Sequence, residues 1–424
     1  MKNITNRKKQ QDTPQQHPHR GYESLELEGH VRWVPVVLGS LIMMCLGTVY
    51  AWSVFRLPVQ DAYGVGATAG GLPYMVSLAV YALSMLLTGR HLGDMSPRKL
   101  IWMGSALVAL GWMLSSLATG IGGLTLSYGV LIGAGVGIAY GAPMNVAARW
   151  FPRQKGLAVG LVLLGFGMSP LVTAPLVRLL LEAVGLSRTF MVLGISFGIL
   201  MPLLAVPLRM PPLEGAVVGS GRDHGGDGHE VSTDRMLKTR SFPWLYGTFL
   251  MGATIGLTVI GLTGSIGVSY VGLSSVASAG LISLFAVFNG LGRPLFGWLT
   301  DRLGPRQAIR ISFTLITGAS VLMLVAGPGR PVAFALAFSI FWLNLGGWLA
   351  IAPTTTLAFY GTRYYGQNYG VLFTAYGLGA IAGVLLSGFI LDVLGRASFI
   401  FVLVAVLALV GLGMSYRVVR EDTL

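Results

Sequence analysis

One arginine stands inside a long segment that carries no other charge. No Asp, Glu, Lys or Arg occurs from Ser241 to Gly292, and Arg293 follows at once, eight residues before Asp301. If this segment is a membrane helix that ends near Asp301, a rise of 1.5 Å per residue puts Arg293 about 12 Å deep in a hydrocarbon core about 30 Å thick. An arginine at that depth costs roughly 2.5 to 3.5 kcal/mol, so it is expected to face a polar cavity and to have a function. Its planar guanidinium matches a carboxylate, which makes Arg293 a candidate anion-binding residue; the alternative is a structural arginine satisfied by backbone carbonyl groups.

Polar and aromatic side chains in the other uncharged segments are candidate partners for such an anion site. Asn289 precedes Arg293 by four residues, so both lie on one helix face, where Asn289 could hold the guanidinium, contact substrate or bond between helices. Tyrosine and tryptophan supply a hydroxyl or an indole N–H and are cheap to bury, although each is also a common packing residue. The further candidates are Tyr50, Trp52, Tyr140, Trp342, Trp348 and Tyr376, together with Asn344.

The composition places these residues in membrane helices. Of the 424 residues, 54% are hydrophobic and 11% charged, whereas soluble proteins carry roughly a quarter charged residues. A water-soluble fold is therefore excluded, and runs of about 20 apolar residues predict membrane spans. The chain is predicted to be an all-α polytopic membrane protein with twelve transmembrane helices, near 33–55, 70–89, 100–119, 122–148, 156–177, 189–208, 243–264, 275–299, 311–327, 331–359, 367–391 and 397–416.

The distribution of positive charge indicates how the chain is oriented in the membrane and does not indicate a nucleic-acid partner. The net charge is +13, but the 29 Lys and Arg residues are spread over the short segments between apolar runs. If both termini are cytoplasmic, inner segments hold 23 of these cations and outer segments hold five, and Arg293 is the remaining one. The positive-inside rule then predicts a multi-pass protein of the cell (inner or cytoplasmic) membrane with both termini cytoplasmic. The single cysteine, Cys45, permits no intrachain disulfide and no Cys-based metal site, and neither a metal nor a cofactor is expected.

A Gly-rich polar stretch divides six spans from six. Residues 209–240 include Gly219-Ser-Gly-Arg-Asp-His-Gly-Gly-Asp-Gly and are expected to form a flexible linker. The predicted organisation is a cytoplasmic disordered tail (1–32), an N-terminal six-helix bundle (33–208), this cytoplasmic linker (209–240), a C-terminal six-helix bundle (241–416) and a short cytoplasmic tail (417–424).

The two sets of six spans look like copies of one unit. The segment 89–98 after span 2 matches 297–306 after span 8, and 149–156 before span 5 matches 363–370 before span 11. Glu182 beyond span 5 likewise matches Asp392 beyond span 11. A duplicated six-helix unit is the economical explanation, and duplicated halves suit alternating access around a central site. At the position equivalent to Arg293 the first copy has Met85, so the scaffold itself does not require a cation there.

The repeated loop carries a family resemblance. Gly297-x-Leu-x-Asp301-Arg302-x-Gly-x-Arg306 resembles the loop signature of the major facilitator superfamily, whose members are secondary transporters with two pseudo-symmetric bundles of six helices. The first copy departs from it, since Asp94 stands one place late and Ser96 replaces a glycine. The resemblance implies gating residues that pair between helices in one state and separate in the other, namely Asp94, Arg98, Asp301, Arg302 and Arg306.

Four further motifs resemble the oxalate/formate antiporter family and related monocarboxylate transporters, over residues 33 to 416. They are Gly47-Thr-Val-Tyr-Ala-Trp-Ser-Val-Phe55, Ala148-Arg-Trp-Phe-Pro152 with Gly156-Leu-Ala-Val-Gly160, Asn289-Gly-Leu-Gly-Arg-Pro294 and Asn368-Tyr-Gly-Val-Leu-Phe-Thr-Ala375. Two departures bear on substrate. Oxalate-exchanging members have a lysine in span 11 where this chain reads Thr374-Ala375-Tyr376, and animal-type monocarboxylate carriers have an aspartate at the position of Asn289. The first departure favours a monocarboxylate over oxalate, and the second leaves no acid within a span to carry a coupling proton.

The expected function is secondary transport of small monocarboxylate anions, such as lactate, pyruvate or formate, by a monomeric protein that binds the carboxylate through Arg293. The alternatives are an oxalate/formate-type anion exchanger or a major facilitator carrier for another organic solute, such as a drug or a sugar. A coupling proton or a counter-anion is a further expected partner. A membrane enzyme is disfavoured because the spans hold no acid or histidine as general base, and a receptor is disfavoured because no cytoplasmic domain is large enough.

Overall fold

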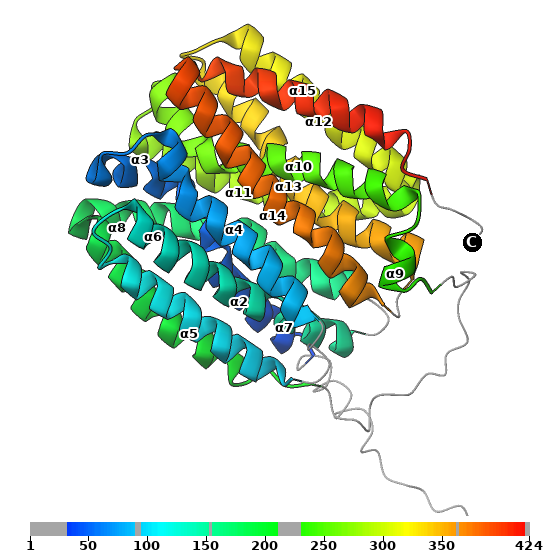
Figure 1. Cartoon of the computed structure of the whole chain (residues 1–424). Helices are drawn as coiled ribbons and strands as arrows, with labels where there is room; N and C mark the ends of the chain where they lie inside the picture. The colour runs from blue at the N-terminus through cyan, green and yellow to red at the C-terminus, as the bar shows by residue number, and fades with distance from the viewer. Residues whose placement is uncertain (1–31, 90–94, 152–154, 211–229, 362–363, 420–424) are drawn as a thin grey trace, which may run out of the picture.

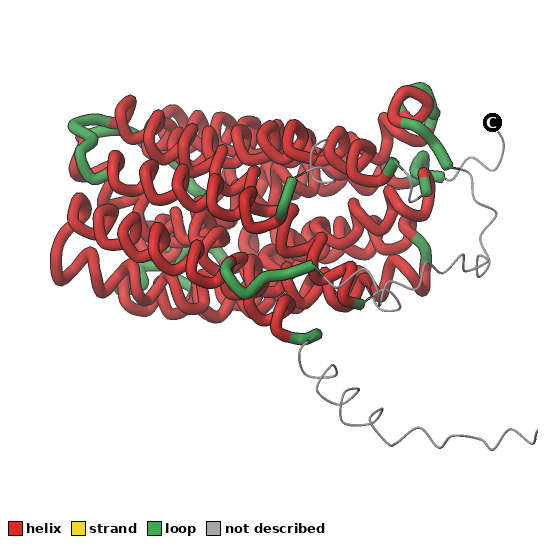
Figure 2. The backbone as a smooth tube through the Cα atoms, turned by 90° about the horizontal axis from the view of Figure 1, so that it is seen from below, coloured by secondary structure: helices red, strands yellow, loops and turns green. Residues whose placement is uncertain are grey.

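The chain folds into long helices that lie side by side (Figures 1 and 2). The structure is a computed structural model that describes residues 32–89, 95–151, 155–210, 230–361 and 364–419, and these residues include no β-strand. The predicted N-terminal tail and most of the predicted linker lie outside the described residues. The helices are α2 (Val34–Leu46), η1 (Gly47–Ala51), α3 (Trp52–Tyr63), α4 (Ala67–Gly89), α5 (Pro97–Ser115), α6 (Ile121–Leu124), η2 (Thr125–Ile132), α7 (Gly133–Trp150), α8 (Lys155–Ala205), α9 (Thr233–Met236), α10 (Ser241–Ser265), η4 (Ile266–Tyr270), α11 (Ser275–Leu303), α12 (Pro305–Ala326), α13 (Pro331–Tyr360), α14 (Tyr365–Phe389), η5 (Ile390–Leu394) and α15 (Ser398–Ser415).

Each of the twelve predicted spans overlaps a continuous helical segment, which consists of one or more of these helices. Ten helical segments of the described chain are long and apolar enough to cross a membrane. One of them, Ala158–Ala205, holds two predicted spans, because Gly185 has φ 78° and ψ 175° and interrupts the helix. The remaining span is α5, which has Arg98 and Lys99 in its first turn. The prediction of an all-α polytopic protein is therefore confirmed.

The first span is longer than predicted, and this changes the position of one charge. The segment Val34–Tyr63 stays helical through η1 and α3, until Gly64 ends it with a left-handed φ of 61°. Arg56 therefore lies within the helix and is 1% exposed. The predicted end of this span at residue 55 is therefore too early for the helix, and Arg56 and Arg293 are both buried arginines of the described residues.

The helix ends gather at two ends of the molecule. We call the end that holds Arg98 and Arg306 the motif end, and the end that holds Arg56 and Asp392 the opposite end. We also call the helices from α2 to α8 the first half and those from α10 to α15 the second half. That the motif end is cytoplasmic stays a prediction from the distribution of Lys and Arg.

The two halves meet along three pairs of helices. Helix α4 packs against α14, α8 packs against α11, and α3 packs against α10. Within the second half, α11 and α13 cross closely because Gly292 lies against the carbonyl group of Leu343 and Gly346 lies against that of Asn289. Small residues allow membrane helices to approach in this way. The crossing fixes the part of α11 that carries Arg293.

Large apolar side chains point outward over the length of many helices. This is the reverse of a soluble protein, which rarely exposes wide apolar patches, and it provides a surface for lipid. Examples that are more than half exposed come from both halves: Leu83, Leu87, Leu126, Leu179, Ile199, Leu203, Leu291, Trp298, Val325, Leu336 and Phe389.

The end of the predicted linker is folded onto the second half. Residues 230–240 include α9, whose Met236 is fully buried. The Thr233 hydroxyl donates to Oδ1 of Asn368 at 2.8 Å, and Nδ2 of Asn368 donates to the Val231 carbonyl at 2.9 Å. These bonds attach the segment to α14 at the motif end.

Candidate functional site

Arg293 is buried at the contact between the two halves. It is 2% exposed and lies on α11, where its Nη1 donates to the carbonyl oxygen of Leu163 on α8 at 2.6 Å. The Nε and Nη2 atoms have no hydrogen-bond partner, and no described Asp or Glu forms an ion pair with this guanidinium. A backbone carbonyl thus satisfies one of its donors and leaves the buried Nε and Nη2 without an acceptor.

Helix α8 provides the surface on which the guanidinium rests. The ring of Phe166 lies 5.9 Å from the guanidinium carbon of Arg293. The next residue is Gly167, where a Cβ atom would lie 2.7 Å from Oδ1 of Asn289 and 3.0 Å from Nε of Arg293. A side chain at this position would displace both polar groups. The absence of one allows Arg293 and Asn289 to reach across the contact between the halves.

Asn289 is held one turn away from Arg293, as the spacing predicted. Its Nδ2 donates to the Trp342 carbonyl at 3.1 Å, whereas its Oδ1 has no partner. The indole of Trp342 in turn donates to the Thr263 hydroxyl at 3.1 Å. Asn289 and Trp342 therefore connect α11, α13 and α10, with one amide oxygen left free near Arg293.

Tyrosine and phenylalanine rings surround the guanidinium. The hydroxyl groups of Tyr50 and Tyr376 are 2.6 Å apart and join η1 to α14. Tyr50 and Tyr140 each pack edge-on against Phe166, at centroid distances of 5.1 and 5.4 Å. Tyr81 contacts Tyr140 at 5.2 Å and Tyr376 at 6.0 Å. Tyr50 and Tyr140 both lie within electrostatic range of Arg293. The structure thus gathers Arg293, Asn289, Trp342, Tyr50, Tyr140 and Tyr376 of the predicted set.

Three other predicted site residues make their contacts elsewhere. The indole of Trp52 donates to the Gly70 carbonyl at 3.2 Å, and its ring packs on Tyr128 within the first half. Trp348 packs against Phe249 and Phe313 on α10 and α12. The amide nitrogen of Asn344 donates to the Ile340 carbonyl of its own helix at 2.7 Å, and its oxygen has no partner.

The loop-motif arginines contact carbonyl groups and aromatic rings. Nε of Arg98 donates to the Leu208 carbonyl at 2.9 Å, Arg302 lies over Trp298, and Arg306 lies over Tyr416.

Asp301 of the same motif is exposed and forms no ion pair with any described residue. Asp94 lies outside the described residues. The expected pairing of motif acids and bases between helices is therefore not present within the described part of the motif.

Arg56 is a buried cation that the sequence analysis did not include among the candidate site residues. Its Nη1 donates to the Gly261 carbonyl of α10 at 3.3 Å, and its Nη2 donates to the Ala67 carbonyl at 2.7 Å. Asp392 lies close enough to interact with its charge. The Asp392 carboxylate accepts hydrogen bonds from the backbone N–H groups of Ala67 and Thr68 at 2.8 and 2.9 Å. These contacts join the halves at the opposite end.

Signals for the surface beneath Arg293 and for the burial of Arg56 were present in the sequence. Gly165-Phe166-Gly167 places an aromatic ring between two glycines in the middle of a span, a pattern that allows another helix to approach closely. For Arg56 the useful signal was the unbroken apolar character on both sides of it, from Val34 to Val59.

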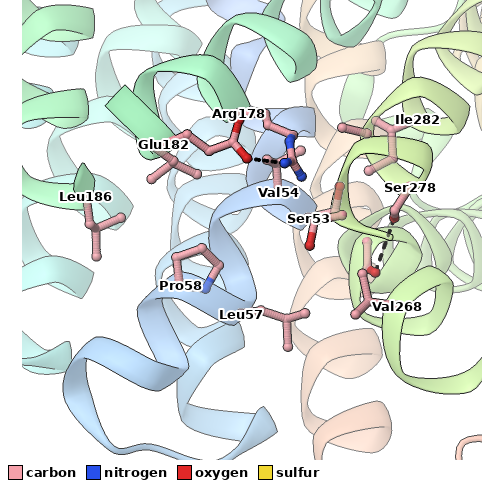
Figure 3. Close-up of a pocket in the computed structure, with 14 residues that line it drawn as sticks. Ser53, Val54, Leu57, Pro58, Arg178, Glu182, Leu186, Val268, Ser278 and Ile282 are labelled. Atoms are coloured by element: carbon pink, nitrogen blue, oxygen red, sulfur yellow. Dashed lines mark hydrogen bonds and ion pairs between the residues drawn. The ribbon is translucent and has the colours of Figure 1, made fainter. Parts of the chain in front are cut away.

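A cavity opens between the halves at the opposite end (Figure 3). Its volume is about 300 Å³, and α3, α8, α10, η4 and α11 contribute to its wall. Arg178 and Glu182 of α8 form an ion pair across one turn of helix, and Figure 3 shows the Glu182 carboxylate pointing at the guanidinium of Arg178. The pair leaves this cavity with no net charge from its lining residues.

Comparisons with known proteins agree with the fold and the motifs. The sequence profile of the Major Facilitator Superfamily matches residues 37–384. The chain is 31% identical to the oxalate:formate antiporter of Oxalobacter formigenes over 83% of each protein. It is 26% identical to monocarboxylate transporter 13 of Bos taurus, covering 93% of this chain and 90% of the relative.

A solved structure has the same overall fold. It is a bacterial homolog of the human lysosomal transporter Spinster in an inward-facing and occupied conformation, with a TM-score of 0.65 and 16% sequence identity over 92% of this chain and 93% of that one. The family match over residues 37–384 and the 31% identity to the oxalate:formate antiporter show, in agreement with the loop motif and the fold, that the chain belongs to the Major Facilitator Superfamily of membrane transporters.

Proposed function

We propose that the protein transports small monocarboxylate anions such as lactate, pyruvate or formate across the cell membrane, with Arg293 binding the carboxylate. The observation that carries this proposal is the guanidinium of Arg293, which is 2% exposed and leaves Nε and Nη2 without partners. Two parallel N–H donors are the arrangement that a carboxylate accepts most strongly. The surrounding tyrosines add hydroxyl groups that can bond to the anion, and their apolar rings are favourable to bury.

In this proposal alternating access acts on a hydrogen bond that Arg293 makes across the contact between the halves. That bond runs from α11 in the second half to the Leu163 carbonyl in the first half. When the halves separate, the guanidinium loses this acceptor and becomes open to an anion. A bound carboxylate neutralises the charge, which lowers the electrostatic penalty of closing an apolar site around it. In this proposal both termini are cytoplasmic, and the motif end faces the cytoplasm.

An oxalate/formate-type exchanger is the second candidate. The 31% identity to the oxalate:formate antiporter favours it. A dicarboxylate carries two negative charges, and a second cation near Arg293 would match it, yet the chain reads Thr374-Ala375-Tyr376 in α14 where a lysine is expected for oxalate exchange. Tyr376 instead bonds to Tyr50. A single guanidinium therefore favours a monocarboxylate.

Transport by purified protein in liposomes separates these candidates. We expect uptake of radiolabelled lactate, pyruvate or formate into empty vesicles, with or without acceleration by an imposed pH gradient. An exchanger would need a counter-anion inside the vesicles and would prefer oxalate. The monocarboxylate proposal would be rejected if the vesicles took up oxalate and none of the monocarboxylates, and if this uptake required formate or oxalate inside the vesicles.

A further inference from the structure

A second cavity at the opposite end differs from the first in charge. Its volume is about 490 Å³, and Arg56 and Arg396 both line it. No described Asp or Glu is among its lining residues, whereas Arg178 in the first cavity is paired with Glu182. The larger cavity therefore holds two positive charges and is attractive to an anion.

Arg56 has donors left for such an anion. A guanidinium has five N–H donors, and the structure gives Arg56 two acceptors, the carbonyl groups of Gly261 and Ala67. Its side chain is 1% exposed, so its charge is shielded from water and acts strongly on the space beside it. Arg396 lies at the rim and forms no ion pair with a described residue.

The nearest acid is occupied elsewhere. Asp392 accepts from the backbone N–H groups of Ala67 and Thr68 and from the Thr68 hydroxyl, and it caps the N-terminus of α4. Four residues separate it from Arg396, but Asp392 does not line the cavity. Its charge is thus compensated by the helix end and does not cancel both arginines.

The rest of the cavity wall supplies neutral hydrogen-bonding groups. Gln60, Ser269 and Ser398 line it, and so does Ser265, whose buried hydroxyl has no partner. Carboxylate oxygens accept from hydroxyl and amide donors as well as from guanidinium groups. The volume is sufficient for a small carboxylate with bound water.

We propose that this cavity is a second binding site for small carboxylate anions, which holds the anion between Arg56 and Arg396. The class of ligand in this proposal rests on the proposed function. The cavity and the positive charge of its two arginines are observed independently of that function. The site collects anions at the opposite end, at the contact between the two halves that also holds Arg293. Because Arg396 is exposed, this capture weakens as salt screens its charge.

Equilibrium binding tests the site separately from transport. Binding of radiolabelled lactate and oxalate to purified protein at low ionic strength is measured for Arg293→Gln, for Arg293→Gln/Arg396→Gln and for the matched control Arg293→Gln/Arg188→Gln. Arg188 is an exposed arginine near the same end that lines neither cavity. We expect Arg293→Gln and the control to retain binding and the Arg396 double variant to lose at least about two thirds of it.

Kinetics provide a second measurement in a protein with an intact Arg293. Arg396→Gln is expected to raise KM by about threefold to fivefold at low salt with kcat unchanged, Arg396→Lys to restore the wild-type value, and high salt to remove the difference. The proposal of a second site would be overturned if the three Arg293→Gln proteins bound the anions equally. It would also be overturned if Arg396→Gln left KM unchanged at low salt. Absence of carboxylate transport by the wild type would instead reject the proposed function, and the binding comparison would still decide the second site.

Discussion

The hydroxyl groups of Tyr50 and Tyr376 meet at 2.6 Å across the contact between the two halves, although 326 residues separate them in the chain. Both side chains are buried, and their rings belong to the aromatic cluster that surrounds Arg293. This hydrogen bond must break whenever η1 and α14 move apart. It therefore connects the conformation of the transporter to the environment of its candidate anion site.

Removal of one hydroxyl leaves the other buried without a partner. We expect Tyr50→Phe and Tyr376→Phe each to destabilise the protein by about 1 to 3 kcal/mol, and the double variant to lose less than the sum of the two. Melting temperatures of the four proteins measure this coupling. Fully additive effects would show that the two hydroxyls do not interact in solution.

Asn289→Asp places a carboxylate one turn from Arg293. The new acid, when ionised, competes with substrate for the guanidinium, and its protonation frees the arginine. We therefore expect the uptake rate of this variant, relative to that of the wild type at the same pH, to be low at neutral pH and to rise as the pH falls. Initial uptake rates across a pH series test it. A pH profile identical to that of the wild type would contradict a site in which Asn289 and Arg293 act together.

Gly167→Ala tests the close contact beneath the guanidinium. An added methyl group would meet Oδ1 of Asn289 and Nε of Arg293, so we expect substrate KM to rise about tenfold or more through displacement of both groups. The matched control is Gly160→Ala on the same helix, where a Cβ atom meets nothing within 4 Å. An equal effect of both substitutions would indicate a general loss of helix flexibility.

Asp392→Ala removes the cap that the second half provides to α4. Loss of a helix N-cap costs about 0.5 to 2 kcal/mol, and here the cap exists only while the halves are closed at the opposite end. We expect that end to open more often, which exposes Ser53 in the smaller cavity. Labelling of Ser53→Cys by a membrane-impermeant thiol reagent should become several times faster.

The native cysteine and surface charge require controls in this labelling experiment. Cys45→Ser provides the background, because Cys45 is the single cysteine of the chain. Asp61→Ala removes an exposed acid near the same end and should leave the labelling rate unchanged. A rate unaffected by Asp392→Ala would show that the cap does not hold this end closed.

Trp52→Phe should affect stability and not substrate affinity. Its indole bonds to the Gly70 carbonyl and its ring packs on Tyr128, both within the first half. We expect the variant to lose about 1 kcal/mol of stability, seen as a lower melting temperature, with an unchanged KM for any transported carboxylate. A large rise in KM without a change in melting temperature would place Trp52 in the substrate site instead.

The sequence predicted the helices and Arg293 because both depend on local composition. A long apolar segment must become a helix in a membrane, and a single cation within such a segment stands out. The four-residue spacing likewise placed Asn289 beside Arg293. These predictions needed no knowledge of which helices touch.

The arrangement around Arg56 could not be predicted because its partners are distant in sequence. Gly261 is 205 residues from Arg56, and the amide groups that Asp392 caps are more than 320 residues from it. The predicted first span ended at residue 55, just before the charge of Arg56, whereas the helix continues to Tyr63. Similarly, the local sequence provided no reason to assign Trp52 and Tyr50 different roles. The two residues are two positions apart, yet Tyr50 bonds to the second half and Trp52 bonds within the first half.

The most direct test of the central claim is transport by charge-altered Arg293 proteins. Arg293→Lys keeps the charge but loses the fork of donors, and Arg293→Ala loses both. With the wild type, each is purified, checked for an unchanged elution profile and reconstituted, and uptake of radiolabelled lactate, pyruvate and formate is measured. We expect both variants to lose transport while they still insert into the membrane. Near-normal uptake by both would contradict Arg293 as the carboxylate-binding residue.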